Sequence, residues 1–343
     1  MIDLHAHILP DLDDGAKDWQ ETLDMCAIAL NDGIHTIVAT PHVKRGMYTP
    51  AKDLILSKVA ELNHRLLHAP CPMPPAPRLA PSPPLSNVKS KTLEVTPHVS
   101  RPSPLADSSL PIAENQDPRA MSHDPFSSRL VPRSLTILPG ADNAFEPDIL
   151  DQLEQGTALY LAHPTNAINA PNAINANNPT NVSREMRSIF YRDPTNPINP
   201  TNSFRYVLLE LSDYFLLPQV KDLIRKLREK NIVPVLSHPE RIAMIQKNHK
   251  LLHELIQAGA LSQVTAMSIT GEFGKEIKKL TRTLIRKNLA HVIASDSHSK
   301  DRRPPILSQA VSEVADLIGS DKAELMVQGI PRAIIEGKEV SIN

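Results

Sequence analysis

The chain has 343 residues, and its 37 Lys and Arg residues nearly balance its 38 Asp and Glu residues, which gives a formal net charge of −1 at pH 7. A chain without an excess of basic residues lacks the positive electrostatic potential that attracts nucleic acid, so we expect no nucleic-acid partner. The N-terminus has no signal-peptide pattern, and no apolar run reaches the ~18 residues of a membrane span. We therefore expect a cytoplasmic protein with no direct membrane insertion.

The first fifteen residues place two histidines together on a predicted strand. Apolar and polar residues alternate over 2–8, and side chains of a strand alternate between its faces, so His5 and His7 point the same way. Neutral imidazole is the commonest ligand for Zn, Mn and Fe. The loop that follows carries three carboxylates, at Asp11, Asp13 and Asp14. The pattern favours a metal site, and a surface strand with two solvated histidines is the alternative.

A helix, a second strand and a longer helix are expected next. Asp18 and Glu21 resemble a capping box that starts the first helix. Residues 34–40 are apolar and β-branched, which predicts a strand whose end carries His42. The second helix is expected over 49–68. Its expected buried stripe is Leu54, Val59, Leu62 and Leu66.

Two low-complexity stretches interrupt this pattern. Residues 69–133 hold nearly half of the 32 prolines, and residues 164–203 repeat short units such as Pro-Thr-Asn and Asn-Ala-Ile-Asn. Neither stretch has a hydrophobic period, so neither buries enough apolar surface to offset the entropy of ordering it. We expect both to be disordered insertions in a single domain that spans residues 1–343.

Strands and helices alternate regularly in the rest of the chain. A strand over 135–142 ends at Asp142, and a buried strand over 205–211 carries Glu210 near its end. This alternation predicts an α/β fold built on a parallel sheet. Further strands are expected over 232–236, 261–266 and 291–295, and helices over 147–156, 218–230, 248–259 and 274–288.

Histidines and carboxylates recur at the ends of these strands. Active-site residues of an α/β barrel lie at the carboxyl ends of its strands, so side chains from distant parts of the chain are expected to meet there. Such ligands, without sulfur, suit a multinuclear site for Mn, Fe or Zn. The predicted metal ligands are His5, His7, Asp14, His42, Asp142, Glu210, His238, Asp296 and His298.

The motifs around these residues resemble those of the PHP (polymerase and histidinol phosphatase) superfamily. More narrowly, they resemble the CpsB/CapC group of manganese-dependent protein tyrosine phosphatases. The resemblance covers about residues 1–68, 135–162 and 204–343. The motifs that carry it are Asp-Leu-His-Ala-His-Ile-Leu-Pro at 3–10, Asp-Asp-Gly at 13–15, Ile-Val-Ala-Thr-Pro-His at 37–42, His-Pro-Glu-Arg at 238–241, Gln-Val-Thr-Ala at 263–266, Gly-x-Phe-Gly at 271–274 and Ala-Ser-Asp-Ser-His at 294–298.

The resemblance implies a distorted (β/α)7 TIM-like PHP barrel, here with two long insertions, and a site for three metals. The implied metal is Mn²⁺, with Fe and Zn as alternatives. In the family a Gly-x-Glu carboxylate bridges two of the metals, whereas this chain has Gly140-Ala-Asp142, one methylene shorter, and Glu146 is an alternative bridge. The implied ligand sets are His5, His7 and Asp296 for the first metal, Glu210 and His238 for the second, and Asp14, His42 and His298 for the third.

The implied activity is that of a protein-tyrosine-phosphatase in capsule or exopolysaccharide synthesis. Its implied partner is a phosphotyrosine protein, specifically a membrane-associated bacterial tyrosine kinase, and a homo-oligomer is compatible with the sequence. A small-molecule phosphatase of the histidinol phosphatase type is one alternative. A catalytically impaired metal-binding adaptor, with Asp142 as the mark of lost activity, is another.

Two arginines and two cysteines bear on the chemistry. Arg241 and Arg303 correspond to arginines at the site of the family and are expected to bind phosphate oxygens. The alternatives are an ion pair with Glu240 for the first and solvation for the second. No arginine stands six residues after Cys26 or Cys71, which excludes a thiolate phosphoenzyme. The basic loop at 43–46 either binds an anion or is solvated.

Overall fold

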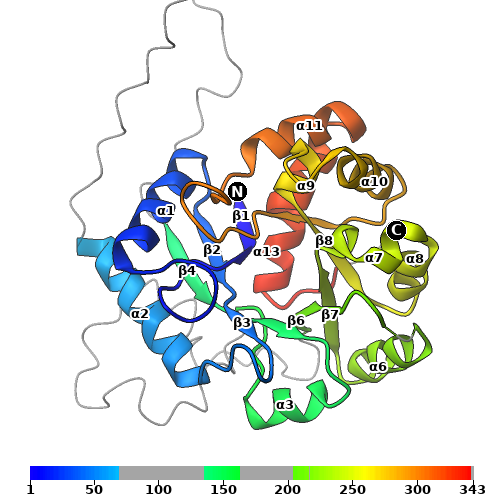
Figure 1. Ribbon diagram of the computed structural model, residues 1–343, viewed down its shortest axis with the longest axis horizontal. Coiled ribbons are helices and arrows are strands. Elements are labelled where there is room, and N and C mark those ends of the chain that lie inside the picture. The colour runs from blue at the N-terminus through cyan, green and yellow to red at the C-terminus, as the bar shows by residue number, and fades with distance from the viewer. Residues whose placement is uncertain (69–134, 163–203, 216, 341–343) are drawn as a thin grey trace, which may run out of the picture. The chain divides into compact units, whose positions relative to one another are not determined.

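The structure is a computed structural model that describes residues 1–68, 135–162, 204–215 and 217–340. The two expected insertions, 69–133 and 164–203, lie outside the described residues, so their disorder and the single domain expected for the chain stay predictions. Figure 1 shows the strands in the middle of the described part, with helices around them. The strands are β1 (Ile2–Ala6), β2 (Thr36–Ala39), β3 (His42–Val43), β4 (Thr136–Pro139), β5 (Asp142–Ala144), β6 (Arg205–Glu210), β7 (Ile232–Ser237), β8 (Leu261–Thr265) and β9 (Val292–Ala294).

The strands form two parallel sheets, as the regular alternation of strands and helices predicts. One sheet has the order β1-β2-β4 and the other the order β3-β5-β6-β7-β8-β9. Strand β2 continues into β3 after Thr40, and β4 continues into β5 after Gly140. A Cβ at Gly140 would lie 2.8 Å from the Cγ1 atom of Val38, so only glycine fits at this crossing. Because every strand pair is parallel, the carboxyl ends of the strands in each sheet lie at the same edge of that sheet.

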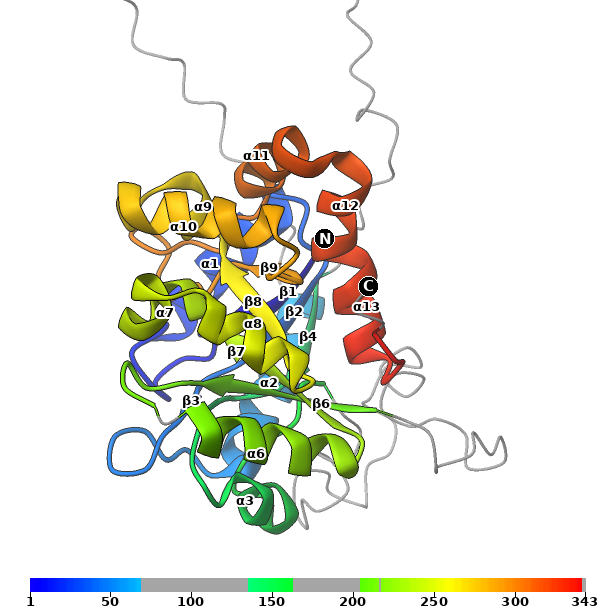
Figure 2. The same cartoon turned by 90° about the vertical axis from the view of Figure 1, so that its right-hand side faces the viewer.

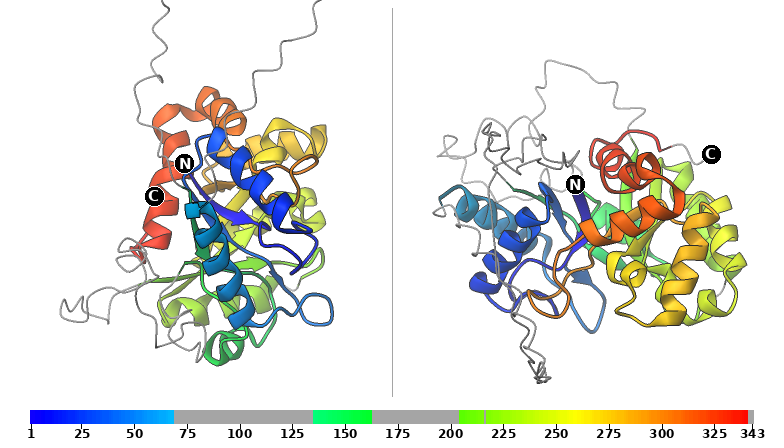
Figure 3. Two further views of the ribbon diagram at one scale, coloured as in Figure 1. Left: turned by 90° about the vertical axis from the view of Figure 1, so that its left-hand side faces the viewer. Right: turned by 90° about the horizontal axis from the view of Figure 1, so that it is seen from above.

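Helices surround the strands and bury their outer faces. Helices α6 to α8 lie outside β6 to β8 (Figure 2), and α1 and α2 lie on one side of the strands with α8 and α10 on the other (Figure 3). No helix in the described ranges is both long enough and apolar enough to span a bilayer. The helices are α1 (Trp19–Asn31), α2 (Lys52–His68), α3 (Ile149–Gln155), α6 (Leu217–Glu229), α7 (Ala243–Lys247), α8 (Lys250–Gln257), α9 (Ala266–Thr270), α10 (Lys275–Arg286), α11 (Ser308–Ile318), α12 (Ser320–Glu324) and α13 (Ile330–Ile335), with the short turns η2 (Pro239–Arg241) and η3 (Leu325–Gly329).

The start of α1 matches half of the expected capping box. The Asp18 side chain accepts a hydrogen bond from the backbone N–H of Glu21 at 2.8 Å, but the Glu21 carboxylate accepts from Lys17 instead of from the cap residue. Cys26 lies on the buried face of this helix, and burial raises the pKa of its thiol to about 12. A protonated, buried thiol cannot act as a nucleophile.

The buried face of α2 differs by one residue from the expected stripe. The predicted core residue Leu54 is 45% exposed, whereas Ile55 is fully buried. That prediction was wrong by one position. Residues four apart lie on the same face of a helix, so the buried face that contains Val59 also contains position 55 and not position 54. The same face buries the side chain of Asn63.

Asn63 joins α2 to the strand that leads to the predicted ligand Asp142. Its side-chain amide donates to the carbonyl oxygens of Val59 (2.9 Å) and Ile137 (2.8 Å). Its side-chain oxygen accepts from the N–H of Ile137 at 3.0 Å. One buried side chain therefore pairs both backbone groups of a residue on the outer strand of the sheet, where a missing partner would be costly.

We expect Asn63→Ala to lower the free energy of unfolding by about 2–4 kcal/mol, because it leaves the buried backbone groups of Ile137 unpaired. Urea denaturation measures this loss. Asn31→Ala, at an exposed position that ends α1, is the matched control and should change the free energy by no more than about 0.5 kcal/mol. Equal effects of the two substitutions would contradict the role assigned to Asn63.

Candidate metal centre

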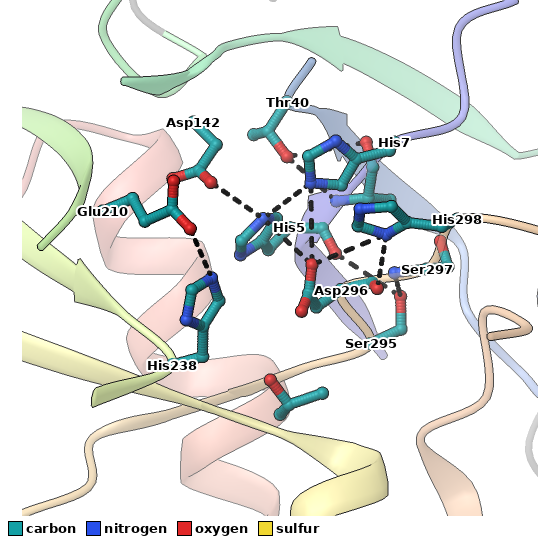
Figure 4. Close-up of polar contacts among 12 residues, drawn as sticks. His5, His7, Thr40, Asp142, Glu210, His238, Ser295, Asp296, Ser297 and His298 are labelled. Atoms are coloured by element: carbon teal, nitrogen blue, oxygen red, sulfur yellow. Dashed lines mark hydrogen bonds and ion pairs between the residues drawn. The ribbon is translucent and has the colours of Figure 1, made fainter. Parts of the chain in front are cut away.

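The carboxyl ends of six strand segments bring imidazoles and carboxylates together. Figure 4 shows side chains from the ends of β1, β6, β7 and β9 pointing toward one another, with Asp142 among them. The residues come from positions as far apart as 5 and 298, so the fold alone makes them neighbours. The predicted ligands that the structure places in this cluster are His5, His7, Asp14, His42, Asp142, Glu210, His238, Asp296 and His298.

His5, His7 and Asp296 form the buried centre of the cluster. The Nε2 atoms of the two histidines lie 3.0 Å apart. They lie 3.4 Å (His5) and 3.5 Å (His7) from Oδ1 of Asp296. Both histidines are fully buried. These three residues are the set that the resemblance gives to the first metal.

Asp142 reaches two histidines although its side chain is short. Its Oδ2 atom lies 3.7 Å from Nε2 of His5 and 3.2 Å from Nδ1 of His42. The carboxylate is fully buried, and neither of its oxygens makes a hydrogen bond. Buried polar atoms without partners carry a large free-energy penalty unless a cation or water pairs with them. Glu146, the alternative bridge, instead accepts from Gln152 at 2.8 Å and lies 3.2 Å from Arg45.

The other predicted ligands flank this centre. Glu210 Oε1 lies 3.8 Å from Nε2 of His238, and Oδ1 of Asp14 lies 3.7 Å from Nε2 of His42 and 3.5 Å from Nε2 of His298. The Asp14 side chain is 52% exposed, so the cluster opens to solvent on its side.

Three sets of ligand atoms are close enough to hold a cation each. Within each set the ligand atoms lie within 4.8 Å of one another. The grouping differs from the one that the resemblance implies: His7, His42 and Asp142 each belong to two sets, and Asp296 and His238 belong to none. The sets are His7, Asp14, His42 and His298; His5, His7 and Asp142; and His42, Asp142 and Glu210.

The electrostatics of the cluster also fit bound cations. Burial favours neutral imidazole and lowers the pKa of His298 to about 2 and that of His238 to about 3. Burial opposes protonation of His7 too, but its hydrogen bonds to Asp13 and Asp296 outweigh burial and raise its pKa to about 10. Without a metal, a proton on His7 thus offsets part of the buried negative charge, and a cation bound at Nε2 would replace that proton. The neutral imidazoles keep lone pairs that a divalent transition metal requires.

Two residues that the sequence analysis did not assign to the site orient its histidines. The carboxylate of Asp13 lies 2.6 Å from Nδ1 of His7 and accepts the backbone N–H of His42 at 2.8 Å. The side-chain oxygen of Gln263 lies 2.8 Å from Nδ1 of His5. Such partners fix the ring and leave Nε2 free for a metal. A glutamine inside β8, a strand that is buried along its whole length, was the signal that could have identified Gln263.

Strained backbone marks two of the predicted ligands. Non-glycine residues rarely have positive φ angles, yet φ is 33° at His238 and 51° at Asp296. Hydrogen bonds hold both segments. Glu240 accepts from the N–H of Thr265 at 2.9 Å, which fixes the turn after His238, and the N–H of Asp296 donates to the carbonyl of His5 at 2.8 Å.

Arg241 and Arg303 both reach the cluster. Each donates from its guanidinium group to Oδ2 of Asp296, and their side chains are 30% and 22% exposed. Both alternatives from the sequence are therefore wrong: Arg241 pairs with Asp296 because Glu240 turns inward to Thr265, and Arg303 is held by the same carboxylate and not simply solvated.

The basic loop after His42 pairs with acids of the chain. Arg45 lies 2.5 Å from the carboxylate of Asp148, and Lys44 lies 3.8 Å from that of Glu210. The arginine is exposed, so its ion pair contributes little to stability. The loop brings Tyr48 over His42, with ring centroids 5.7 Å apart and planes 14° apart.

Comparison with known proteins gives relatives along nearly the whole chain. The tyrosine-protein phosphatase YwqE of Bacillus subtilis (strain 168) is 25% identical over 328 residues, which cover 96% of this chain and 89% of that protein. The putative tyrosine-protein phosphatase CapC of Staphylococcus aureus is 26% identical over 313 residues, 91% of this chain and 83% of the other. The tyrosine-protein phosphatase CpsB of Streptococcus pneumoniae is 24% identical over 340 residues, 98% of each chain.

The fold is also that of a solved structure. A crystal structure from the work on YwqE of Bacillus subtilis and CpsB of Streptococcus pneumoniae, described as unique metal-dependent tyrosine phosphatases, superimposes with a TM-score of 0.65 at 23% identity. The match covers 100% of this chain and 97% of that one, and it confirms the mixed α/β fold with parallel sheets.

The family model for capsular polysaccharide synthesis, CpsB/CapC, matches residues 1–73 and 185–336. These ranges contain every predicted ligand except Asp142, together with both arginines of the cluster. The resemblance inferred from the sequence motifs is thereby confirmed, and the chain belongs to the CpsB/CapC family.

Proposed function

We propose that this protein is a metal-dependent phosphatase that hydrolyses phosphotyrosine in proteins. The observation that carries the proposal is the cluster itself: buried imidazoles and carboxylates from six strand segments, bordered by two arginines. The names of the relatives, which are tyrosine phosphatases, support the same substrate class. We further propose that the substrate protein is a membrane-associated bacterial tyrosine kinase that controls capsule or exopolysaccharide synthesis.

We infer that the two sheets belong to one distorted seven-fold barrel. β2 with β3 and β4 with β5 each act as one bent strand, and the parallel bridge between Ala6 and Ser297 joins the last strand to the first. The N–H of His7 supports this closure by donating to the carbonyl of Ser297 at 2.8 Å. In such a barrel the carboxyl ends of all strands surround one site.

We propose that the nine predicted ligands hold up to three Mn²⁺ ions, with Fe and Zn as alternatives, and that Asp142 takes the bridging position. When bound, such ions lower the pKa of water and offset the charge of the reacting phosphoryl group. The chain holds Nε2 of His5 and His7 toward the centre through Gln263 and Asp13, so the ligands are ordered before binding.

Arg241 and Arg303 are proposed to bind the phosphoryl group. A guanidinium group forks onto two phosphate oxygens, and it stabilises the charge that these oxygens carry in the transition state. Both guanidinium groups meet at Oδ2 of Asp296 on the partly exposed side of the cluster. Cys26, the cysteine within the described residues, takes no part, since burial keeps its thiol protonated.

Purified protein with Mn²⁺ should hydrolyse phosphotyrosine peptides and p-nitrophenyl phosphate, and iodoacetamide should not inhibit it, because the nucleophile is not a thiol. Released phosphate measures the reaction. Absence of metal-dependent turnover would sink the proposal. Faster turnover of histidinol phosphate than of phosphotyrosine would favour a small-molecule phosphatase. Metal binding without turnover, restored by Asp142→Glu, would indicate an impaired enzyme.

Removal of metal should lower thermal stability, because cations that bind only the folded chain stabilise it by about 2.7 kcal/mol per site at 100 times Kd. Calorimetric scans of metal-free protein with and without Mn²⁺ measure the shift, expected to be several degrees. Asp142→Asn should reduce the shift. Asp151→Asn, at an exposed position of α3, is the control and should keep it; identical shifts in all three proteins would contradict the role of Asp142.

Arg303→Lys should lower kcat/KM for phosphotyrosine by about 10- to 100-fold, because lysine keeps the charge but loses the two-pronged hydrogen bond to phosphate. The neighbouring Arg302 is exposed, so Arg302→Lys is a matched control that should leave kcat/KM unchanged. If both lysine variants retained full activity, Arg303 would not bind the phosphoryl group.

A further inference from the structure

The side chain of Phe273 is not part of the hydrophobic core. It is half-buried, and it is absent from the residues that form or pack against the three core clusters of the described chain. Its ring centroid instead lies 5.1 Å from Cζ of Arg241 and 5.9 Å from Cζ of Arg303. Phe273 therefore contacts both arginines of the cluster, and core packing does not explain its position.

A tight turn presents this ring at the site. Gly271 ends α9 with a φ angle of 108°, and Gly274 precedes α10 with a φ angle of 100°. The N–H of Gly274 donates to the carbonyl of Gly271 at 2.9 Å. Glycine adopts such angles without steric penalty, whereas other residues rarely do. The two glycines thus reverse the chain around Phe273 and place it beside the arginines.

The position of Arg241 and Arg303 indicates which part of a bound substrate would lie next to the Phe273 ring. Both guanidinium groups converge on Oδ2 of Asp296, so a phosphoryl group bound by them is held at that side of the cluster. Because the Phe273 ring lies beside both arginines, an ester group that extends from the phosphoryl group on that side would meet the ring. Aromatic rings interact favourably at centroid separations of about 4.5–7 Å, and an alkyl group gains less from such a contact.

We propose that Phe273 is a specificity-determining residue that contacts the phenyl ring of the substrate and favours aryl over alkyl phosphate esters. The inference rests on the proposed phosphatase function. Such an aromatic contact contributes about 3- to 10-fold in affinity. The proposed contact explains why a partly exposed phenylalanine borders a site whose other side chains are charged or form hydrogen bonds.

The test uses two inhibitors that differ only in the group on phosphorus. The full chain loaded with Mn²⁺ is titrated with phenylphosphonate and with methylphosphonate in a calorimeter. The wild-type protein should bind phenylphosphonate more tightly. Phe273→Ala should lose about 3- to 10-fold of this preference, with its affinity for methylphosphonate nearly unchanged. Phe204→Ala is the matched control, because Phe204 also packs near an arginine, 5.5 Å from Cζ of Arg228, and should keep the preference.

Other outcomes overturn the inference. Equal weakening of both inhibitors in Phe273→Ala would mean that the ring only positions the arginines. An unchanged preference in Phe273→Ala, or its loss in Tyr48→Ala instead, would assign the contact to another residue. A wild-type protein without the preference would show that no such contact forms. Because the titration measures binding, it separates the two proposals: a chain that does not hydrolyse phosphotyrosine but shows the Phe273-dependent preference contradicts the proposed function alone.

Discussion

The carboxylate of Asp296 is the point on which the site depends. Its backbone has a positive φ angle, and the hydrogen bond from its N–H to the carbonyl of His5 joins the end of β9 to β1. The strain of such a backbone persists only where the surroundings determine it. The same carboxylate contacts five basic side chains, those of His5, His7, His298, Arg241 and Arg303. The residue that joins β9 to β1 is thus also the residue that holds the basic side chains of the site together.

Buried acids that are not themselves predicted ligands keep this arrangement in place. Asp3 accepts from the N–H of Ser295 at 3.0 Å and so holds the segment that leads to Asp296. Asp13 holds the ring of His7 through its Nδ1 atom. Glu240 holds the turn after His238 by accepting from the N–H of Thr265. A buried carboxylate is costly unless it is hydrogen-bonded, and each of these acids accepts hydrogen bonds from backbone or side-chain groups. These three acids therefore support the segments that carry the predicted ligands.

Asp142, for which we propose the bridging position, lies within reach of other predicted ligands. Asp142 has one methylene fewer than the family glutamate, yet it approaches both His5 and His42. Two residues earlier, Gly140 lies so close to Val38 that a Cβ there would come within 2.8 Å of the Val38 Cγ1 atom. The two contacts with His5 and His42 are compatible with the bridging role proposed for Asp142.

The sequence by itself determined the parallel α/β order and the identity of the clustered histidines and acids, because strand periodicity and strand ends are local properties. Only the tertiary structure decided which atoms meet. His5 and Gln263 are 258 positions apart, and their hydrogen bond depends on the register of every strand between them. The pairing of both arginines with Asp296, and the place of Phe273 beside them, likewise follow from packing between loops that no local pattern encodes. The one-residue error at Leu54 has the same origin, because packing against the sheet fixes which helix face is buried.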